Sequence, residues 1–321
     1  MNVKAKGYVL GVIAAATYGM NPLFALPLYK AGMNPDSVLF FRYLFAIVLV
    51  GLMLKARGRS FRVTARQGAY LLALGVMMSL SSLALFASYN YMEAGIASTL
   101  LFVYPILVAL IMALVFKEGL RWMTVACIAL ALAGIGLLYK AGDGSTLSLA
   151  GTLLVLLSSL TYAVYIVGAN RPLLKNVATL TVTFYVLLFG STLFVARFLW
   201  GEPLTLPGGE HWYLWGNLVA LAIFPTAISF LCTTSAIQYI GSTPTAILGA
   251  LEPVTAVFFG IVVFGETLTL RECTGLVLII VAVTMVVAGG SITASLVRFR
   301  RLFPRLPLRP GTFFSRLSRR K

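Results

Sequence analysis

Apolar residues fill this chain in ten long stretches, separated by short breaks that are charged or rich in turn-forming residues. Most stretches hold roughly 20 residues, enough for a helix with a rise of about 1.5 Å per residue to cross about 30 Å of hydrocarbon. The stretches are continuous and do not alternate with polar residues, which favours helices over barrel strands. The predicted spans are residues 7–29, 36–54, 68–92, 95–116, 122–139, 149–169, 180–200, 213–237, 242–264 and 271–291. We therefore predict an all-α polytopic membrane protein with ten transmembrane helices.

Composition supports a membrane environment and gives no sign of an enzyme. Of the 321 residues, 60% are hydrophobic and 11% are charged, whereas soluble domains are about half apolar and a quarter charged. The chain has one histidine, three cysteines without CxxC spacing, and no HExxH, GxSxG or Walker motif. We predict no catalytic residues, no metal site and no cofactor. Energy for any transport then comes from a gradient or from another subunit.

The two halves of the chain carry the same landmarks in the same order. Gly7 and Tyr18 recur 144 residues later as Gly151 and Tyr162. A second set recurs at offsets of 146, 148 and 148 residues, namely Gly95, Pro105 and Glu118 as Gly241, Pro253 and Glu266. Because five spans per half is an odd number, the second half enters the membrane in the opposite orientation, as in many secondary transporters.

This repeat divides the chain into three parts. Residues 1–140 form the first five-helix repeat, residues 149–291 the second, inverted repeat, and residues 292–321 a basic tail. With the N-terminus in the cytoplasm, 20 of the 25 basic residues fall on the cytoplasmic side, as the positive-inside rule requires. The outer side then holds only Lys30, Lys140, Arg197 and Arg271. We predict that both termini are cytoplasmic.

The tail concentrates the positive charge of the protein. Residues 297–321 contain nine basic and no acidic residues, interleaved with phenylalanines and prolines. Such a segment is expected to lie flexibly along the anionic inner leaflet. An inert topology anchor and a protein-binding segment are alternatives. No feature makes nucleic-acid binding specific, so we predict no nucleic-acid partner, and a homodimer is left open.

Two charged residues, Arg42 and Glu252, lie well inside the predicted spans, where charge is costly and commonly functional. Glu252 is about ten residues into its span, roughly 15 Å deep, and precedes Pro253, which should free the carbonyl near Gly249. It is predicted to bind a cationic or amino group of the substrate, or to take up a proton coupled to movement. The alternative is a carboxylate buried against Arg42 or hydroxyl groups to fix packing.

Arg42 should lie only part-way into the membrane from the outer side. Its planar fork of donors suits a substrate carboxylate. The alternatives are a side chain that extends to the outer headgroups, or an ion pair with Asp36.

Polar groups on three further spans are predicted to line the same central cavity. The first span contains Tyr18 and Asn21 in a helix break that covers residues 18–22, with a second break at Pro27, and the sixth carries Tyr162 and Tyr165 on one face. The fourth span places Tyr104 and the helix-breaking Pro105 at the depth of Glu252 and the helix-breaking Pro253. Paired interruptions in inverted halves point to a substrate site, although buried tyrosines are often only packed.

Glu118 and Glu266 end the fourth and ninth spans and stand just before the next helix. A carboxylate in this position favours the N-terminal dipole of the helix that follows. We interpret both residues as structural.

Together these residues resemble the EamA-type branch of the drug/metabolite transporter superfamily over nearly the whole of residues 7–291. The resemblance rests on the order and spacing of the landmarks: Phe41-Arg42-Tyr43, a proline-centred fourth span ending at Lys117-Glu118, and Leu251-Glu252-Pro253 followed by Gly265-Glu266. It implies a ten-helix inner-membrane carrier, usually an exporter of amino acids, related metabolites or drugs, that works by alternating access. The chain departs from the family pattern at Tyr18-Gly19, where a tryptophan often precedes the glycine, and in its long basic tail.

The leading hypothesis is therefore a secondary, ATP-independent exporter of amino acids or related small metabolites. A multidrug or nucleotide-sugar carrier is an alternative, although nucleotide sugars would call for more intramembrane basic residues than Arg42. A membrane scaffold that works through its basic tail is a third hypothesis, but it has no use for matched prolines beside a buried glutamate.

Overall fold

The computed structural model describes residues 3–116, 122–138, 148–169, 171–174, 176–208, 212–240, 248–249, 251–271, 273–282 and 284–285. Within these ranges the protein is entirely helical. Seven helical stretches are long and apolar enough to cross a membrane: Lys4–Lys30, Pro35–Ala56, Ala65–Ser88, Ala94–Val115, Leu149–Ala169, Thr179–Leu199 and Trp212–Thr233. Shorter apolar helices cover Leu251–Phe264 and Cys273–Ala282. The protein is an all-helical membrane protein with at least seven candidate spans.

Several of these stretches are built from two or more helical segments. The elements of the first half are α1 (Val3–Gly19), α2 (Asn21–Lys30), α3 (Pro35–Ala56), α4 (Ala65–Ser88), α5 (Ala94–Leu101), α6 (Tyr104–Phe116) and α7 (Trp122–Leu138). Those of the second half are α8 (Leu149–Ala169), the 3-10 turn Pro172–Leu174, α9 (Thr179–Leu199), α10 (Trp212–Ala222), the π-helical turn Ile223–Ile228, α11 (Ser229–Ile240) and α13 (Leu251–Phe264).

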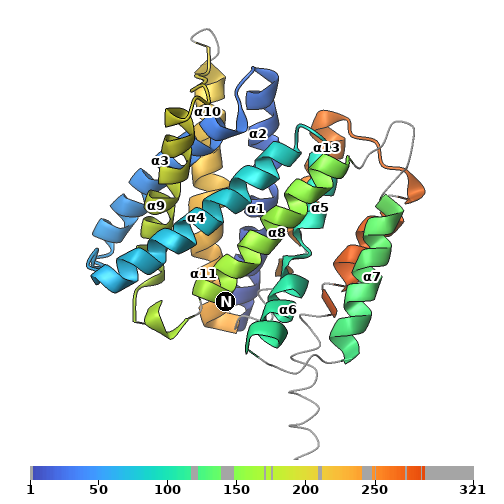
Figure 1. Cartoon of the computed structure of the whole chain (residues 1–321), viewed down its shortest axis with the longest axis horizontal. Coiled ribbons are helices and arrows are strands. Elements are labelled where there is room, and N and C mark those ends of the chain that lie inside the picture. The colour runs from blue at the N-terminus through green and yellow to red at the C-terminus, as the bar shows by residue number, and fades with distance from the viewer. Residues whose placement is uncertain are drawn as a thin grey trace, which may run out of the picture.

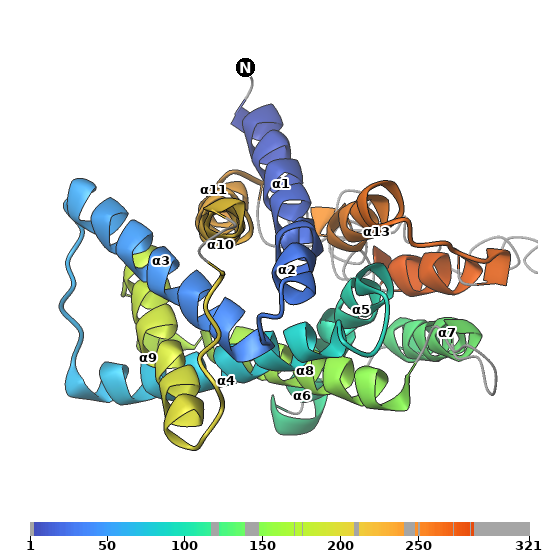
Figure 2. The ribbon, with the colours of Figure 1, turned by 90° about the horizontal axis from the view of Figure 1, so that it is seen from above.

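Helices from the two halves of the sequence interleave. Helix α4 runs beside α8 across the front of the molecule and also packs against α9 (Figure 1). Seen from above, α1 lies between α11 and α13, and α5 packs against α13 (Figure 2). Side chains that meet between these helices therefore come from both halves of the chain.

Helix interruptions occur at the two predicted prolines. Helix α5 ends at Leu101, and α6 begins at Tyr104 with Pro105 in its first turn. Helix α13 begins at Leu251 with Pro253 in its first turn. A proline is tolerated in a first turn because its missing N–H would have no helical partner there. Each proline thus begins a new helical segment in the middle of an apolar stretch.

Two details of the predicted breaks are wrong. The carbonyl of Gly249 is not left free, because it accepts a hydrogen bond of 2.9 Å from the backbone N–H of Glu252. In the first span the first break falls at Met20, as predicted, but the second break predicted at Pro27 is absent, because α2 continues through Pro27 to Lys30. Proline has no backbone N–H, so one hydrogen bond of the helix is missing at Pro27. Membrane helices tolerate such a gap when neighbouring helices or side chains satisfy the freed carbonyl group.

The break at Met20 brings α1 against the start of α13. A Cβ atom on Gly19 would lie 2.5 Å from the carbonyl oxygen of Glu252 and 2.7 Å from the Cβ of Thr255. Such distances exclude any side chain at position 19 without movement of the backbone. Glycine therefore allows this approach, which carries the neighbouring Tyr18 to the turn that holds Glu252.

Candidate functional site

Polar residues from four helices meet around the start of α13. Tyr18 ends α1, Tyr104 begins α6, Tyr162 and Tyr165 lie on α8, and Glu252 lies in the first turn of α13. The rings of Tyr104 and Tyr162 contact edge to face with centroids 4.7 Å apart, and those of Tyr162 and Tyr165 stack at 6.0 Å. The structure thus brings together five of the residues that the sequence suggested for one site.

The carboxylate of Glu252 has no compensating partner in the described part of the chain, where it forms neither a hydrogen bond nor an ion pair. The phenols of Tyr18, Tyr104 and Tyr162 each lie within electrostatic range of it. A carboxylate that serves packing is normally hydrogen-bonded or paired, because an unpaired charge is costly to bury. The packing alternative expected Glu252 to lie against Arg42 or hydroxyl groups, and the described contacts contain neither an ion pair with Arg42 nor a hydrogen bond from a hydroxyl group to Glu252.

Arg42 occupies the interior of the bundle. The residue is only 5% exposed, its Nε donates a hydrogen bond of 3.0 Å to Oγ1 of Thr226, and its guanidinium lies 5.4 Å from the centre of the Phe86 ring. Neither of its two terminal nitrogens donates to a described residue. Both structural alternatives proposed for Arg42 are wrong, because the side chain neither extends to the headgroups nor pairs with Asp36.

Asp36 instead pairs with an arginine that follows it by 161 residues. Its carboxylate accepts hydrogen bonds from Nε of Arg197 and, at 3.2 Å, from Nη2. The same Nη2 donates to Glu202 at 2.8 Å. This network joins the start of α3 to the end of α9.

Tyr18 lies within electrostatic range of both Arg42 and Glu252. The guanidinium of Arg42, whose terminal nitrogens bond to no described residue, and the carboxyl group of Glu252 therefore both lie near one phenol. Neither group is paired with a residue in the described part of the chain.

Asn21, the other predicted residue of the first span, anchors the helix break. Its Nδ2 donates a hydrogen bond of 2.9 Å to the carbonyl of Tyr18, and the residue is 3% exposed. Its Oδ1 is buried and finds no donor among the described residues. A buried acceptor without a donor is uncommon, and this one belongs to a residue three positions after Tyr18.

Sequence reasoning missed Thr226, which holds Arg42 in place. Its hydroxyl donates to the carbonyl of Leu221 at 3.0 Å and accepts from Arg42. The π-helical turn around Thr226 contains Pro225, and such turns are frequent at functional sites. The signal was a proline and a threonine in the middle of the eighth apolar stretch, the same pattern that marked Pro105 and Pro253.

Glu266 caps a helix, but not the helix that was expected. Its Oε1 accepts a hydrogen bond of 3.2 Å from the backbone N–H of Ala94, at the start of α5 in the other half of the chain. Burial raises the pKa of the Glu266 carboxyl, and the backbone N–H groups of Ala94 and Gly95 offset part of that shift. The predicted role at the following helix is therefore wrong. Its counterpart Glu118 and the basic tail lie outside the described residues.

The fold and the polar cluster together define a multi-pass membrane protein whose interior carries charge, as a carrier of polar molecules requires. The sequence pattern of the EamA-like transporter family matches residues 5–140 and matches again over residues 149–288. This chain belongs to the EamA-like transporter family. It is a membrane transporter and not an enzyme, and the double match indicates duplicated halves.

Similar proteins support the same assignment. An "Uncharacterized transporter" of Archaeoglobus fulgidus is 28% identical over 85% of this chain and 93% of its own length. The "Uncharacterized inner membrane transporter YicL" of Salmonella typhimurium is 23% identical over 89% of this chain and 96% of its own length. A solved structure described as "Crystal structure of protein" is similar with a TM-score of 0.64, at 21% identity, over 94% of this chain and 99% of that one. The last comparison shows the fold alone.

Proposed function

We propose that this transporter is a secondary carrier that exports amino acids or related small metabolites through a site between Arg42 and Glu252. The observation that carries the proposal is the pair of opposite charges beside Tyr18, neither of them neutralised by a described residue. An amino acid in water at neutral pH is a zwitterion, with an ammonium and a carboxylate a few bonds apart. Glu252 would accept the ammonium, and the terminal nitrogens of Arg42 would bind the carboxylate.

The surrounding groups fit this chemistry. The tyrosine rings of α6 and α8 supply apolar faces for a side chain or cation–π contact with an ammonium. The free Oδ1 of Asn21 is one further acceptor on the Tyr18 side. Because an uncompensated charge is most costly without substrate, occupancy of the site stabilises the protein around it.

The carrier is proposed to have ten spans in two inverted halves and to work by alternating access. The breaks at Tyr104 and Leu251 support this mechanism, because each divides a span near its middle and allows one half of the helix to tilt separately. Helices α5 and α13 pack against each other across the two halves. Movement of one half-helix would therefore act directly on the turn that carries Glu252.

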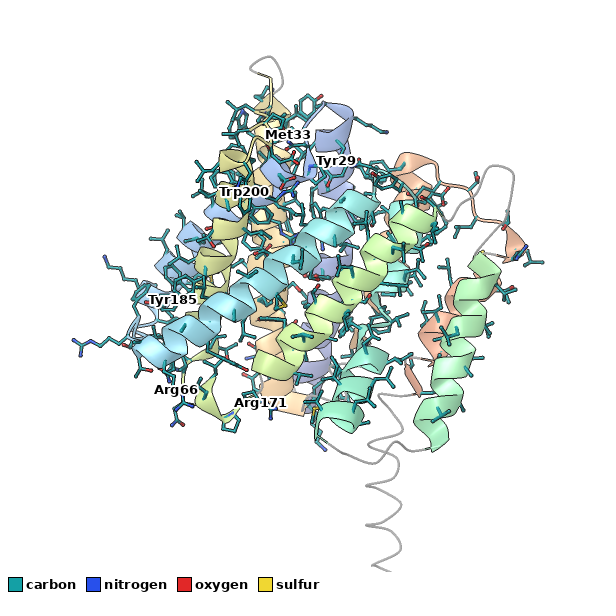
Figure 3. All side chains as sticks on the ribbon, in the orientation of Figure 1. Tyr29, Met33, Arg66, Arg171, Tyr185 and Trp200 are labelled. Atoms are coloured by element: carbon teal, nitrogen blue, oxygen red, sulfur yellow. The ribbon has the colours of Figure 1, made fainter. Side chains whose placement is uncertain are left out.

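An inner-membrane location with both termini in the cytoplasm is proposed from the distribution of charge and tryptophan. Arg66 and Arg171 lie at one end of the bundle, whereas Tyr29, Met33 and Trp200 lie at the other (Figure 3). Trp200 and Trp212 are more than four-fifths exposed, as expected of residues in an interfacial belt. The basic end, which also carries the start of α1, would face the cytoplasm.

The test is a profile of metabolites released by cells that overproduce the protein, followed by counterflow of each candidate into proteoliposomes. The control is the Glu202→Gln variant, which removes an acidic residue from the outer loop, far from Glu252. We expect one class of amino acid or related metabolite to accumulate outside cells with the parent and the control, but not with Glu252→Gln at equal abundance. Equal profiles for the parent, Glu252→Gln and empty cells would contradict the proposal.

A further inference from the structure

A pocket of about 260 Å³ lies away from the Glu252 site, between the end of α3, the start of α9, and α11. Its residues are Val50, Met53, Arg57, Arg59, Val177, Ala178, Thr179, Leu180, Thr183, Ala227, Phe230, Leu231 and Ser235. Both arginines are exposed, so the side of the pocket that carries them is called its mouth, and apolar side chains of α3, α9 and α11 form its walls. It is smaller than the about 300–1,000 Å³ of pockets that enclose whole drug-sized ligands, so it suits one end of a larger molecule.

Several polar groups in the pocket are donors without an acceptor among the described residues. Thr183 is 8% exposed and lines the pocket, yet its hydroxyl forms no hydrogen bond with a described residue. Helix α9 begins in the same wall with Ala178 at its N-cap, where no side chain accepts from the first N–H groups. The guanidinium groups of Arg57 and Arg59 likewise have no acceptor in the described part of the chain.

The mouth of the pocket is held in place by hydrogen bonds from α9 to the loop that carries the arginines. The hydroxyl of Thr181 donates to the carbonyl of Ser60 at 2.9 Å, and that of Tyr185 donates to the carbonyl of Phe61 at 2.7 Å. Tyr185 and Arg66 lie at this corner of the molecule in Figure 3. The loop is therefore fixed to the helix whose N-terminus opens into the pocket.

No described acidic residue lies near this mouth. Asp36 is at the opposite end of α3, which at about 1.5 Å per residue is about 30 Å away, and Glu93, Glu202 and Glu266 belong to loops at that same end. Lys55, Arg62 and Arg66 add positive charge beside the mouth. Uncapped N–H groups, a free hydroxyl and two arginines together form a site for an anion with several oxygens, such as a phosphate group.

We propose that this pocket binds the phosphate group of an anionic phospholipid of the inner leaflet. The outer face of α3 beside the pocket is apolar and exposed at Val48 (56%) and Leu52 (61%), so acyl chains can lie along it while the headgroup enters the pocket. Basic pockets between transmembrane helices on the cytoplasmic side are typical headgroup sites. The site is separate from the transport site and does not depend on the identity of the substrate.

The test is native mass spectrometry of the purified full-length protein titrated with phosphatidylglycerol, with phosphatidylcholine as the neutral lipid. Three variants are compared: the double Arg57→Gln/Arg59→Gln, Thr183→Val, and the charge-matched control Arg62→Gln/Arg66→Gln, whose arginines do not line the pocket. We expect the affinity for the first phosphatidylglycerol to fall at least tenfold in the double variant Arg57→Gln/Arg59→Gln and about threefold in Thr183→Val. The affinity of the control variant should stay within twofold of that of the parent. The basic tail is the same in all proteins, so its contribution cancels.

Two outcomes would overturn the proposal. If the two double variants lost the same affinity for phosphatidylglycerol, the lipid would respond only to the general positive charge at this end of the protein. Displacement of the bound lipid by inorganic phosphate at equal concentration would assign the pocket to a free phosphate and not to a headgroup. Thr183→Val keeps the charge and shape of the pocket, so its lipid affinity tests the site even if the variant Arg57→Gln/Arg59→Gln folds poorly.

Discussion

The two acidic residues Asp36 and Glu252 show how differently this protein treats charge at its periphery and at its centre. Asp36, at the start of α3, is buried but satisfied by Arg197, which also binds Glu202. Glu252, in the middle of the bundle, has no such partner among the described residues, although Arg42 and Glu252 are both within electrostatic range of Tyr18. Because pairing both groups internally would be the cheaper arrangement, their separation supports our proposal that a ligand completes the pair.

The largest effect is expected for Glu252→Gln, which keeps the shape of the side chain and removes its charge. Loss of a desolvated charge–charge contact costs about 2–5 kcal/mol, so transport should fall about 30-fold or more. Thermal stability should stay the same or rise, because the unpaired charge is removed. Counterflow and a thermal-shift assay on the same preparation measure both. Unchanged transport with unchanged pH dependence would exclude both binding and proton coupling at Glu252.

A somewhat smaller effect is expected for Arg42→Gln. Transport should fall about tenfold or more because the substrate carboxylate loses its charged donor. Thr226→Val is the matched control, since it removes the hydrogen bond to Nε but leaves the guanidinium charge. If the control lost as much transport as Arg42→Gln, the role of Arg42 would be structural.

Glu266→Ala should affect stability more than transport. It removes the acceptor for the start of α5, and the loss of a helix cap costs about 0.5–2 kcal/mol. A lower unfolding midpoint with substrate affinity within threefold of the parent is expected in detergent. A large change in affinity at normal stability would instead make the contact between α5 and the loop after α13 part of the transport site.

The smallest effect is expected for Asp36→Asn, the satisfied counterpart of Glu252. It should cost about 1 kcal/mol or less, because the Arg197 side chain is 35% exposed and keeps Glu202 as a partner. Transport should stay within threefold of the parent. A loss of transport as large as that of Glu252→Gln would remove the distinction between the two regions.

The pattern of apolar residues and prolines along short stretches of the sequence predicted much of this architecture and its candidate site. Continuous apolar stretches located the helices, and the prolines at positions 105 and 253 located two breaks, because both signals lie within a few residues of their effect. The shared position of Tyr18, Tyr104, Tyr162 and Glu252 followed from their similar depth in the spans.

Partners far apart in the sequence were not predictable in the same way. The pairing of Asp36 with Arg197 spans 161 residues, and that of Glu266 with Ala94 spans 172. Both depend on which helices become neighbours when the halves interleave, and a single sequence carries no signal of that packing. Proximity along the chain therefore favoured Arg42 as one possible partner of Asp36 and the adjacent helix as the partner of Glu266.

The most direct test of the central claim is competition against counterflow by three analogues of the transported amino acid: the zwitterion itself, the amine without the carboxylate, and the N-acetyl acid without the ammonium. The account predicts that the parent prefers the zwitterion, that Arg42→Gln no longer distinguishes it from the amine, and that Glu252→Gln no longer distinguishes it from the N-acetyl acid. The same loss of selectivity in both variants, or a parent that accepts the amine as well as the zwitterion, would contradict a site with Arg42 and Glu252 as its two poles.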